Sequence, residues 1–157
     1  MNATIETPTL PEAVKRRRGR PMLPMAAVKA VTNLREKAIL DAIDEGRLFW
    51  VWNVSLDPKT SHCRELRFLS EEVGEFATGM SVKRDLDIVV GLLLPHIEPM
   101  VGLVEVRDAF NISDAHALSL GERHQLDICR KGRRGHGGQT LFTRQSIFRF
   151  LKVRLVS

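Results

Sequence analysis

The chain has 157 residues, 43% of them hydrophobic, and a formal net charge of +5. This length accommodates one domain or two very small ones, and the hydrophobic content excludes a wholly disordered chain. Two isolated cysteines, Cys63 and Cys129, give no disulfide framework, and the longest apolar run, Ile88 to Leu94, is too short to cross a bilayer. The polar, acidic N-terminus predicts no secretory signal, so we expect a reduced cytoplasmic (or nuclear) protein without a membrane partner.

The charge is concentrated at the two ends of the chain. Residues 1–31 carry a net +4 and residues 121–157 a net +7, while residues 32–120 carry a net −6. This separation points to a polyanionic partner at the ends rather than to a uniformly adhesive surface.

Residues 1–28 contain four of the seven prolines and little apolar periodicity, so we predict a disordered basic arm. This arm contains Lys15-Arg16-Arg17-Arg18-Gly19-Arg20-Pro21, whose Arg-Gly-Arg-Pro core resembles an AT-hook. In such a hook glycine lets the backbone lie flat in a narrow minor groove while the flanking arginines reach along its floor. Met22-Leu23-Pro24 follows where more cations are usual. A basic arm that binds any phosphate backbone, or a nuclear-targeting segment, is the alternative.

Residues 29–80 are predicted to form a small α+β module. Apolar spacing predicts a helix over 29–46 that ends at Gly46, a typical C-cap glycine. Its predicted inner face carries Val31, Leu34, Ala38, Leu40 and Ile43. Residues 49–56 and 64–69 are predicted strands of a hairpin. Ser70 is the predicted cap of a short helix that has an acidic first turn and runs through Phe76. The aromatic residues Phe49, Trp50 and Trp52 fit either core packing or a nucleobase-stacking platform, and core packing is favoured because Arg47 alone supplies a nearby cation.

Residues 81–157 are predicted to hold a linker helix and a winged helix-turn-helix. The linker helix covers 82–94, ends at Pro95, and could supply a dimer contact, and the β-branched residues of this segment leave a strand as the alternative. A helix over 103–110 is followed by Asn111, which tolerates the left-handed conformation of a tight turn, and by a buried Ile112. Ser113 is the predicted cap of a second helix. Its inner face carries Ala117 and Leu120, with His124 at its end, and its outer face carries Asp114, His116, Ser119 and Arg123.

A basic hairpin and a last helix complete the chain. Residues 126–129 and 139–142 are predicted strands, and the glycine-rich loop between them carries Arg130, Lys131, Arg133 and Arg134. Thr143 is the predicted cap of the last helix. This helix turns Ile147, Phe150 and Leu151 inward and Arg149, Lys152 and Arg154 outward.

The order of helix, Asn-Ile-Ser turn, helix, basic wing and Thr143-Arg144-Gln145-Ser146-Ile147 resembles the excisionase-like, MerR-type winged-helix domains. The resemblance covers about a third of the chain. The chain departs from the family at His124-Gln125-Leu126, where Gly-x-Leu is usual. The resemblance implies DNA binding without catalysis, in recombination directionality, plasmid functions or transcription control.

The two halves show a weak similarity to each other. Gly46-Arg47-Leu48 corresponds to His124-Gln125-Leu126, and residues 68–76 correspond to 142–150. Either the chain contains a degenerate repeat or the similarity is chance. The first copy has a short wing and an acidic last helix, so we expect it to pack or dimerise rather than to read DNA.

The residues supply no enzymatic signature. The chain has no tyrosine, which excludes a tyrosine recombinase or relaxase nucleophile, and it has no phosphate-binding loop, dinucleotide fingerprint or metalloprotease motif. The spacing of His62, Cys63, His124, Cys129 and His136 matches no standard zinc site, so we expect neither metal nor cofactor.

The sequence therefore predicts a non-enzymatic, nucleoid-associated protein of a bacterium or mobile element that binds double-stranded DNA. The N-terminal module could in addition hold a second copy of the chain or another protein. An architectural DNA-bending factor for a recombination or partition complex and a protein-interaction adaptor are the alternatives. The predicted DNA contacts are Arg16, Arg17, Arg18, Gly19, Arg20, Asp114, His116, Ser119, Arg123, Arg130, Lys131, Arg133, Arg134, Arg144 and Arg149.

Overall fold

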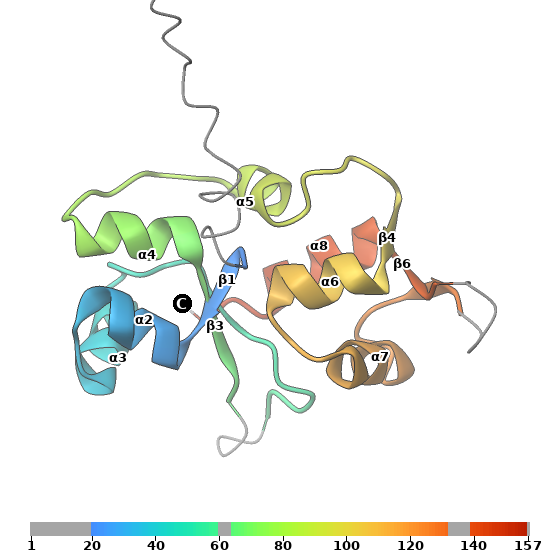
Figure 1. The fold of residues 1–157 in the computed structure, drawn as a ribbon, viewed down its shortest axis with the longest axis horizontal. Coiled ribbons are helices and arrows are strands. Elements are labelled where there is room, and N and C mark those ends of the chain that lie inside the picture. Colours follow the sequence, from blue (N-terminus) through green and yellow to red (C-terminus); the bar gives the residue numbers. More distant parts are fainter. Residues whose placement is uncertain (1–19, 60–63, 132–138, 157) are drawn as a thin grey trace, which may run out of the picture.

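The computed structural model describes residues 20–59, 64–131 and 139–156. These residues form an α+β fold with seven helices and two three-stranded antiparallel sheets (Figure 1). The first unit consists of β1 (Met22–Pro24), α2 (Met25–Thr32), α3 (Glu36–Asp44), β2 (Val51–Asn53), β3 (Leu66–Leu69) and α4 (Ser70–Ala77). After α5 (Leu86–Leu93), the second unit consists of β4 (Met100–Gly102), α6 (Leu103–Phe110), α7 (Asp114–Glu122), β5 (Ile128–Arg130), β6 (Leu141–Thr143) and α8 (Arg144–Val153).

The two units share one element order and one sheet topology. The strand order is β1-β3-β2 in the first unit and β4-β6-β5 in the second. Equivalent backbone hydrogen bonds join equivalent places: Ser70 N donates to Pro21 O at 2.8 Å, and Arg144 N donates to Pro99 O at 2.9 Å. Residues 46–48 and 124–126 occupy the same place after α3 and α7, and residues 68–76 and 142–150 the same strand and helix.

The predicted helix over 29–46 is wrong, because the chain turns at Asn33. Asn33 adopts a left-handed conformation with φ of 55°, which ends α2 and separates it from α3. Val31 and Leu34 are 53% and 37% exposed, and the buried residues of the two helices are Val28, Ile39, Ala42 and Ile43. Asn33 matches Asn111 of the second unit, which has φ of 52°. The turn at Asn33 could therefore have been predicted from its similarity to the Asn111 turn.

The disordered arm predicted over 1–28 is too long. Residues 22–24 form β1, which pairs with β3, and the side chain of Met22 is fully buried. The prolines are compatible with this strand because β1 lies at the edge of its sheet. Residues 1–19 lie outside the described residues.

The remaining elements lie close to their predicted places. Helix α6 has the predicted bounds, and Thr143 Oγ1 caps α8 by accepting from Ser146 N. Helix α5 begins later than predicted, at Leu86, because the Asp85 carboxylate accepts from Ile88 N and caps it there. The predicted cap at Ser70 is wrong, since Ser70 is the first residue of α4 and Leu69 precedes it without a side-chain cap.

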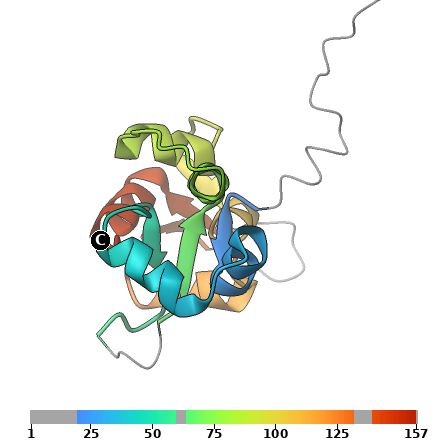
Figure 2. The same ribbon diagram turned by 90° about the vertical axis from the view of Figure 1, so that its left-hand side faces the viewer.

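The first sheet lies between two layers. In the view from the first unit, α2 and α3 stand in front of this sheet (Figure 2). Successive strand residues point to opposite faces, so Val51 joins a core made within the first unit while its neighbours Trp50 and Trp52 join a core shared with the second. The shared core contains Phe110 and Phe150, whose rings stack with centroids 5.5 Å apart. The two units therefore pack as one body, and the aromatic residues Trp50 and Trp52 serve core packing.

We expect Phe110→Ala to lower the free energy of unfolding by about 3–5 kcal/mol, because it empties the centre of the shared core. The control, Val31→Ala on the exposed side of α2, should change it by less than about 0.5 kcal/mol. Urea unfolding followed by tryptophan fluorescence and by far-UV circular dichroism should give coincident transitions in both variants. Because both tryptophans lie in the first unit, a fluorescence transition separated from the loss of helix would contradict the shared core.

Candidate nucleic-acid interface

Helices α6 and α7 and the turn between them form as the sequence predicts. Asn111 ends α6 in the left-handed conformation, Ile112 is 5% exposed, and Ser113 Oγ accepts from His116 N at 3.1 Å. The end of α7 differs from expectation, since His124 is exposed rather than on the inner face. Its φ of 58° lies in the region that favours glycine, and its counterpart Gly46 has φ of 74°.

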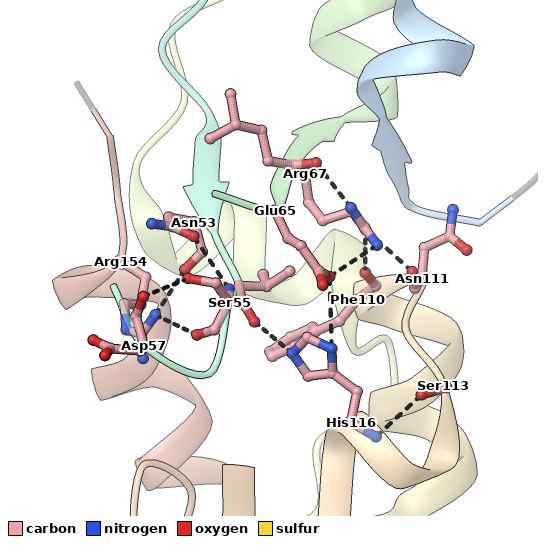
Figure 3. A network of polar contacts seen from close by, with 12 residues as sticks. Asn53, Ser55, Asp57, Glu65, Arg67, Phe110, Asn111, Ser113, His116 and Arg154 are labelled. Carbon is pink, nitrogen blue, oxygen red and sulfur yellow. Dashed lines mark hydrogen bonds and ion pairs between the residues drawn. The ribbon is translucent and has the colours of Figure 1, made fainter. Parts of the chain in front are cut away.

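His116 points toward the first unit. Its Nε2 lies 2.6 Å from the carbonyl oxygen of Val54 and donates to it, and its Nδ1 lies 3.5 Å from a carboxylate oxygen of Glu65 (Figure 3). The side chain is 12% exposed. The predicted outward orientation of His116 is therefore wrong, because the base of the first hairpin covers the N-terminal turn of α7.

Arg154 is also on the inside rather than the outside. It is 8% exposed and donates to the carbonyl oxygens of Asn53 and Ser55 at 3.0 and 2.9 Å (Figure 3). It also donates to Gln125 Oε1. Burial lowers the pKa of this guanidinium. Its backbone is held as well, since Asn53 N donates to Arg154 O at 3.0 Å. Helical periodicity gave no sign of this, because the C-terminal residues leave α8 and run beside β2.

The turn between α6 and α7 is fixed to the first sheet. Arg67 Nε donates to the carbonyl oxygens of Phe110 and Asn111 at 3.2 and 3.1 Å, and burial lowers its pKa. Asn111 Nδ2 donates to Met22 O at 3.2 Å, and Arg20 donates to Asn111 Oδ1 at 2.7 Å. The role of Arg67 was not predicted, and a cation between Leu66 and Phe68 in an apolar strand was its only signal in the sequence.

Two of the predicted DNA contacts, Arg144 and Arg149, have partners within the chain. Arg144 is half-buried and donates to the carbonyl oxygens of His96 and Leu94 at 2.7 and 3.1 Å, so it caps the end of α5. Arg149 is exposed and pairs with Asp127 at 3.3 Å.

The other predicted contacts divide into accessible residues and residues that the structure does not describe. Asp114 is exposed and pairs with Arg107 at 3.3 Å, and Ser119 is half-buried. Arg123, Arg130 and Lys131 are exposed and form no ion pair within the described residues. Residues 16–19, Arg133 and Arg134 lie outside the described ranges.

The two hairpins present different chemistry at equivalent places. In the first hairpin Trp50, Trp52 and Val54 are at most 5% exposed and pack against the second unit. Residues 127–131 are the corresponding stretch of the second hairpin, since Thr143 N donates to Asp127 O as Leu69 N does to Trp50 O, both at 3.0 Å. In this stretch Ile128 packs on the core, whereas Asp127, Cys129, Arg130 and Lys131 are exposed. One hairpin is thus part of the interior, and the other faces solvent with cations.

Comparison of the chain with protein-family models, curated proteins and solved structures found no match. None of the described helices is long and apolar enough to cross a membrane. No three His, Cys, Asp or Glu side chains within the described ranges are grouped so that they could hold a metal ion.

We expect His116→Ala to lower the free energy of unfolding by about 1–2 kcal/mol, because the buried carbonyl group of Val54 loses its donor. Asp114→Ala removes an exposed ion pair two residues earlier and should change stability by less than about 1 kcal/mol. Urea titration of the two variants measures the difference. Equal stabilities would show that His116 does not hold α7 to the first unit.

Proposed function

We propose that the chain is a non-enzymatic protein that binds double-stranded DNA through its second unit, as a transcriptional regulator or mobile-element accessory factor. The observation that carries this proposal is the difference between the hairpins. The face that is apolar and buried in the first unit is polar in the second, where Arg130 and Lys131 extend to solvent without ion-pair partners among the described residues.

The order β4-α6-α7-β5-β6-α8 supports a winged helix-turn-helix assignment for the second unit. Helix α7 would be the reading helix and the β5–β6 hairpin the wing. With His116 engaged by Val54, the accessible polar side chains of α7 are those of Asp114, Ser119 and Arg123. Asp114 could accept from a cytosine amino group and Ser119 could bond to either base edge.

The basic arm begins at the same helix-turn-helix. Arg20, its last cation, donates to Asn111 in the turn between α6 and α7. An arm anchored there starts beside the proposed reading helix, which would place residues 16–20 near the adjacent minor groove or its phosphates. Helix α3 of the first unit is a poorer reader, since its sequence contains Glu36, Asp41 and Asp44 against a single lysine.

We expect the triple variant Arg123→Gln, Arg130→Gln, Lys131→Gln to bind duplex DNA about tenfold or more weakly at physiological salt. The slope of log affinity against log salt should fall by about 0.9 for each phosphate that the variant no longer neutralises. Fluorescence anisotropy over a range of salt concentrations measures both quantities.

The matched control is Arg35→Gln, Lys37→Gln, Lys59→Gln, which removes the same charge from exposed positions of the first unit. Affinity that falls equally in both triple variants would indicate attraction by net charge and overturn the assignment to the second unit. Footprinting of the wild type separates the roles, because a regulator protects one discrete site and an architectural factor protects phased sites and bends the duplex.

A further inference from the structure

A pocket of about 200 Å³ lies between the end of α7 and the last turns of α8. It borders the exposed stretch of the second hairpin at Asp127, which pairs with the lining residue Arg149. Its lining consists of His124, Gln125, Arg149, Phe150, Val153 and Arg154. The guanidinium of Arg154 lies over the Phe150 ring, 4.8 Å from its centroid.

The first unit contains the counterpart of this pocket, nearly closed. A space of about 20 Å³ there is lined by Arg47, Glu75 and Phe76, which match Gln125, Arg149 and Phe150 in the order of the two units, and also by Glu72, Met80, Ser81 and Val82. The guanidinium of Arg47 lies 5.7 Å from the Phe76 ring centroid, as a guanidinium lies over Phe150 in the second unit.

Glu75, which lines the counterpart, is ion-paired with a residue outside the lining. Arg84, whose side chain is 9% exposed, forms a two-pronged ion pair with Glu75 and lies 3.6 Å from Glu71. The hydrogen bond from Arg84 lowers the pKa of the Glu75 carboxyl. In the first unit, an acid on the last helix is therefore matched by a cation of the following segment.

The second unit reverses the sign at this place. Arg149 replaces Glu75, and Arg154 adds a second guanidinium group, so the pocket holds two guanidinium groups and the imidazole of His124. No carboxylate is among the lining residues, and Asp127 reaches Arg149 from the rim, where both side chains are more than half exposed. The acceptors of Arg154 are neutral carbonyl and amide oxygens. The Asp57 carboxylate also interacts with Arg154, but it is not among the lining residues, so an anion bound in the pocket would face two guanidinium groups and no lining carboxylate.

We infer that this pocket binds a phosphate group. Two guanidinium groups present several N–H donors in planar forks, which suit the oxygens of a tetrahedral dianion. The group could belong to a free phosphate or phosphorylated small molecule, or to a nucleic-acid backbone. The inference does not rest on the proposed reading of DNA, because the pocket is defined by its own residues.

The test is the thermal unfolding midpoint in inorganic phosphate, compared with chloride at equal ionic strength. At phosphate concentrations about ten times the dissociation constant, the wild type should gain about 3 °C. Arg149→Gln, at an exposed position, should lose most of this gain, and Arg47→Gln at the counterpart should keep it. Asp127→Asn should increase the gain, because it frees Arg149 and removes a negative charge from the rim.

A wild-type midpoint that does not distinguish phosphate from chloride, or an Arg149→Gln variant that responds like the wild type, would overturn the inference. Competition then identifies the source of the group. Duplex DNA that displaces phosphate supports a backbone phosphate, whereas phosphate binding that is unaffected by duplex supports a small ligand. Phosphate binding in a chain that binds no DNA would contradict the proposed function and leave the pocket in place.

Discussion

The packing of Trp50, Trp52 and Val54 against the second unit is the contact on which the rest of the molecule depends. It gives the first sheet two buried faces, one toward its own helices and one toward the other unit. It also positions the polar contacts around it. Val54 O accepts a hydrogen bond from His116, and the carbonyl oxygens of Asn53 and Ser55 accept from Arg154 (Figure 3). A hairpin used in this way is no longer available as a wing.

Two copies of one element order have consequently diverged in chemistry. The first hairpin is apolar where it meets its neighbour, and the second, at the far end of the molecule from the first unit, is polar and cationic (Figure 1). The same divergence appears between Glu75 and Arg149, which occupy one place on the last helix of each unit. Terminal repeats of a stacked array need a polar outer face, and a basic one would also attract a polyanion. Residues 121–157, with their net charge of +7, belong to the second unit, whose hairpin carries the exposed Arg130 and Lys131.

Local signals predicted most of the second unit, and contacts between distant residues explain what they missed. Ser113, Thr143 and Asn111 act within a few residues of themselves, so caps and turns could be read from their neighbours. His116 and Arg154 are oriented by carbonyl groups more than sixty residues away in sequence, and no helical period contains that information. The turn at Asn33 is also a local feature. It was not predicted because the apolar residues over 29–46 keep a helical spacing across it.

Amide chemical-shift mapping on a labelled chain titrated with duplex DNA tests most directly whether the second unit binds DNA while the first unit only packs against it. We predict that the largest changes fall on α7, on residues 123–131 and at Arg20, while α3 and the first hairpin stay unchanged. Changes concentrated on α3 and residues 35–47, with none along residues 123–131, would contradict this division of roles.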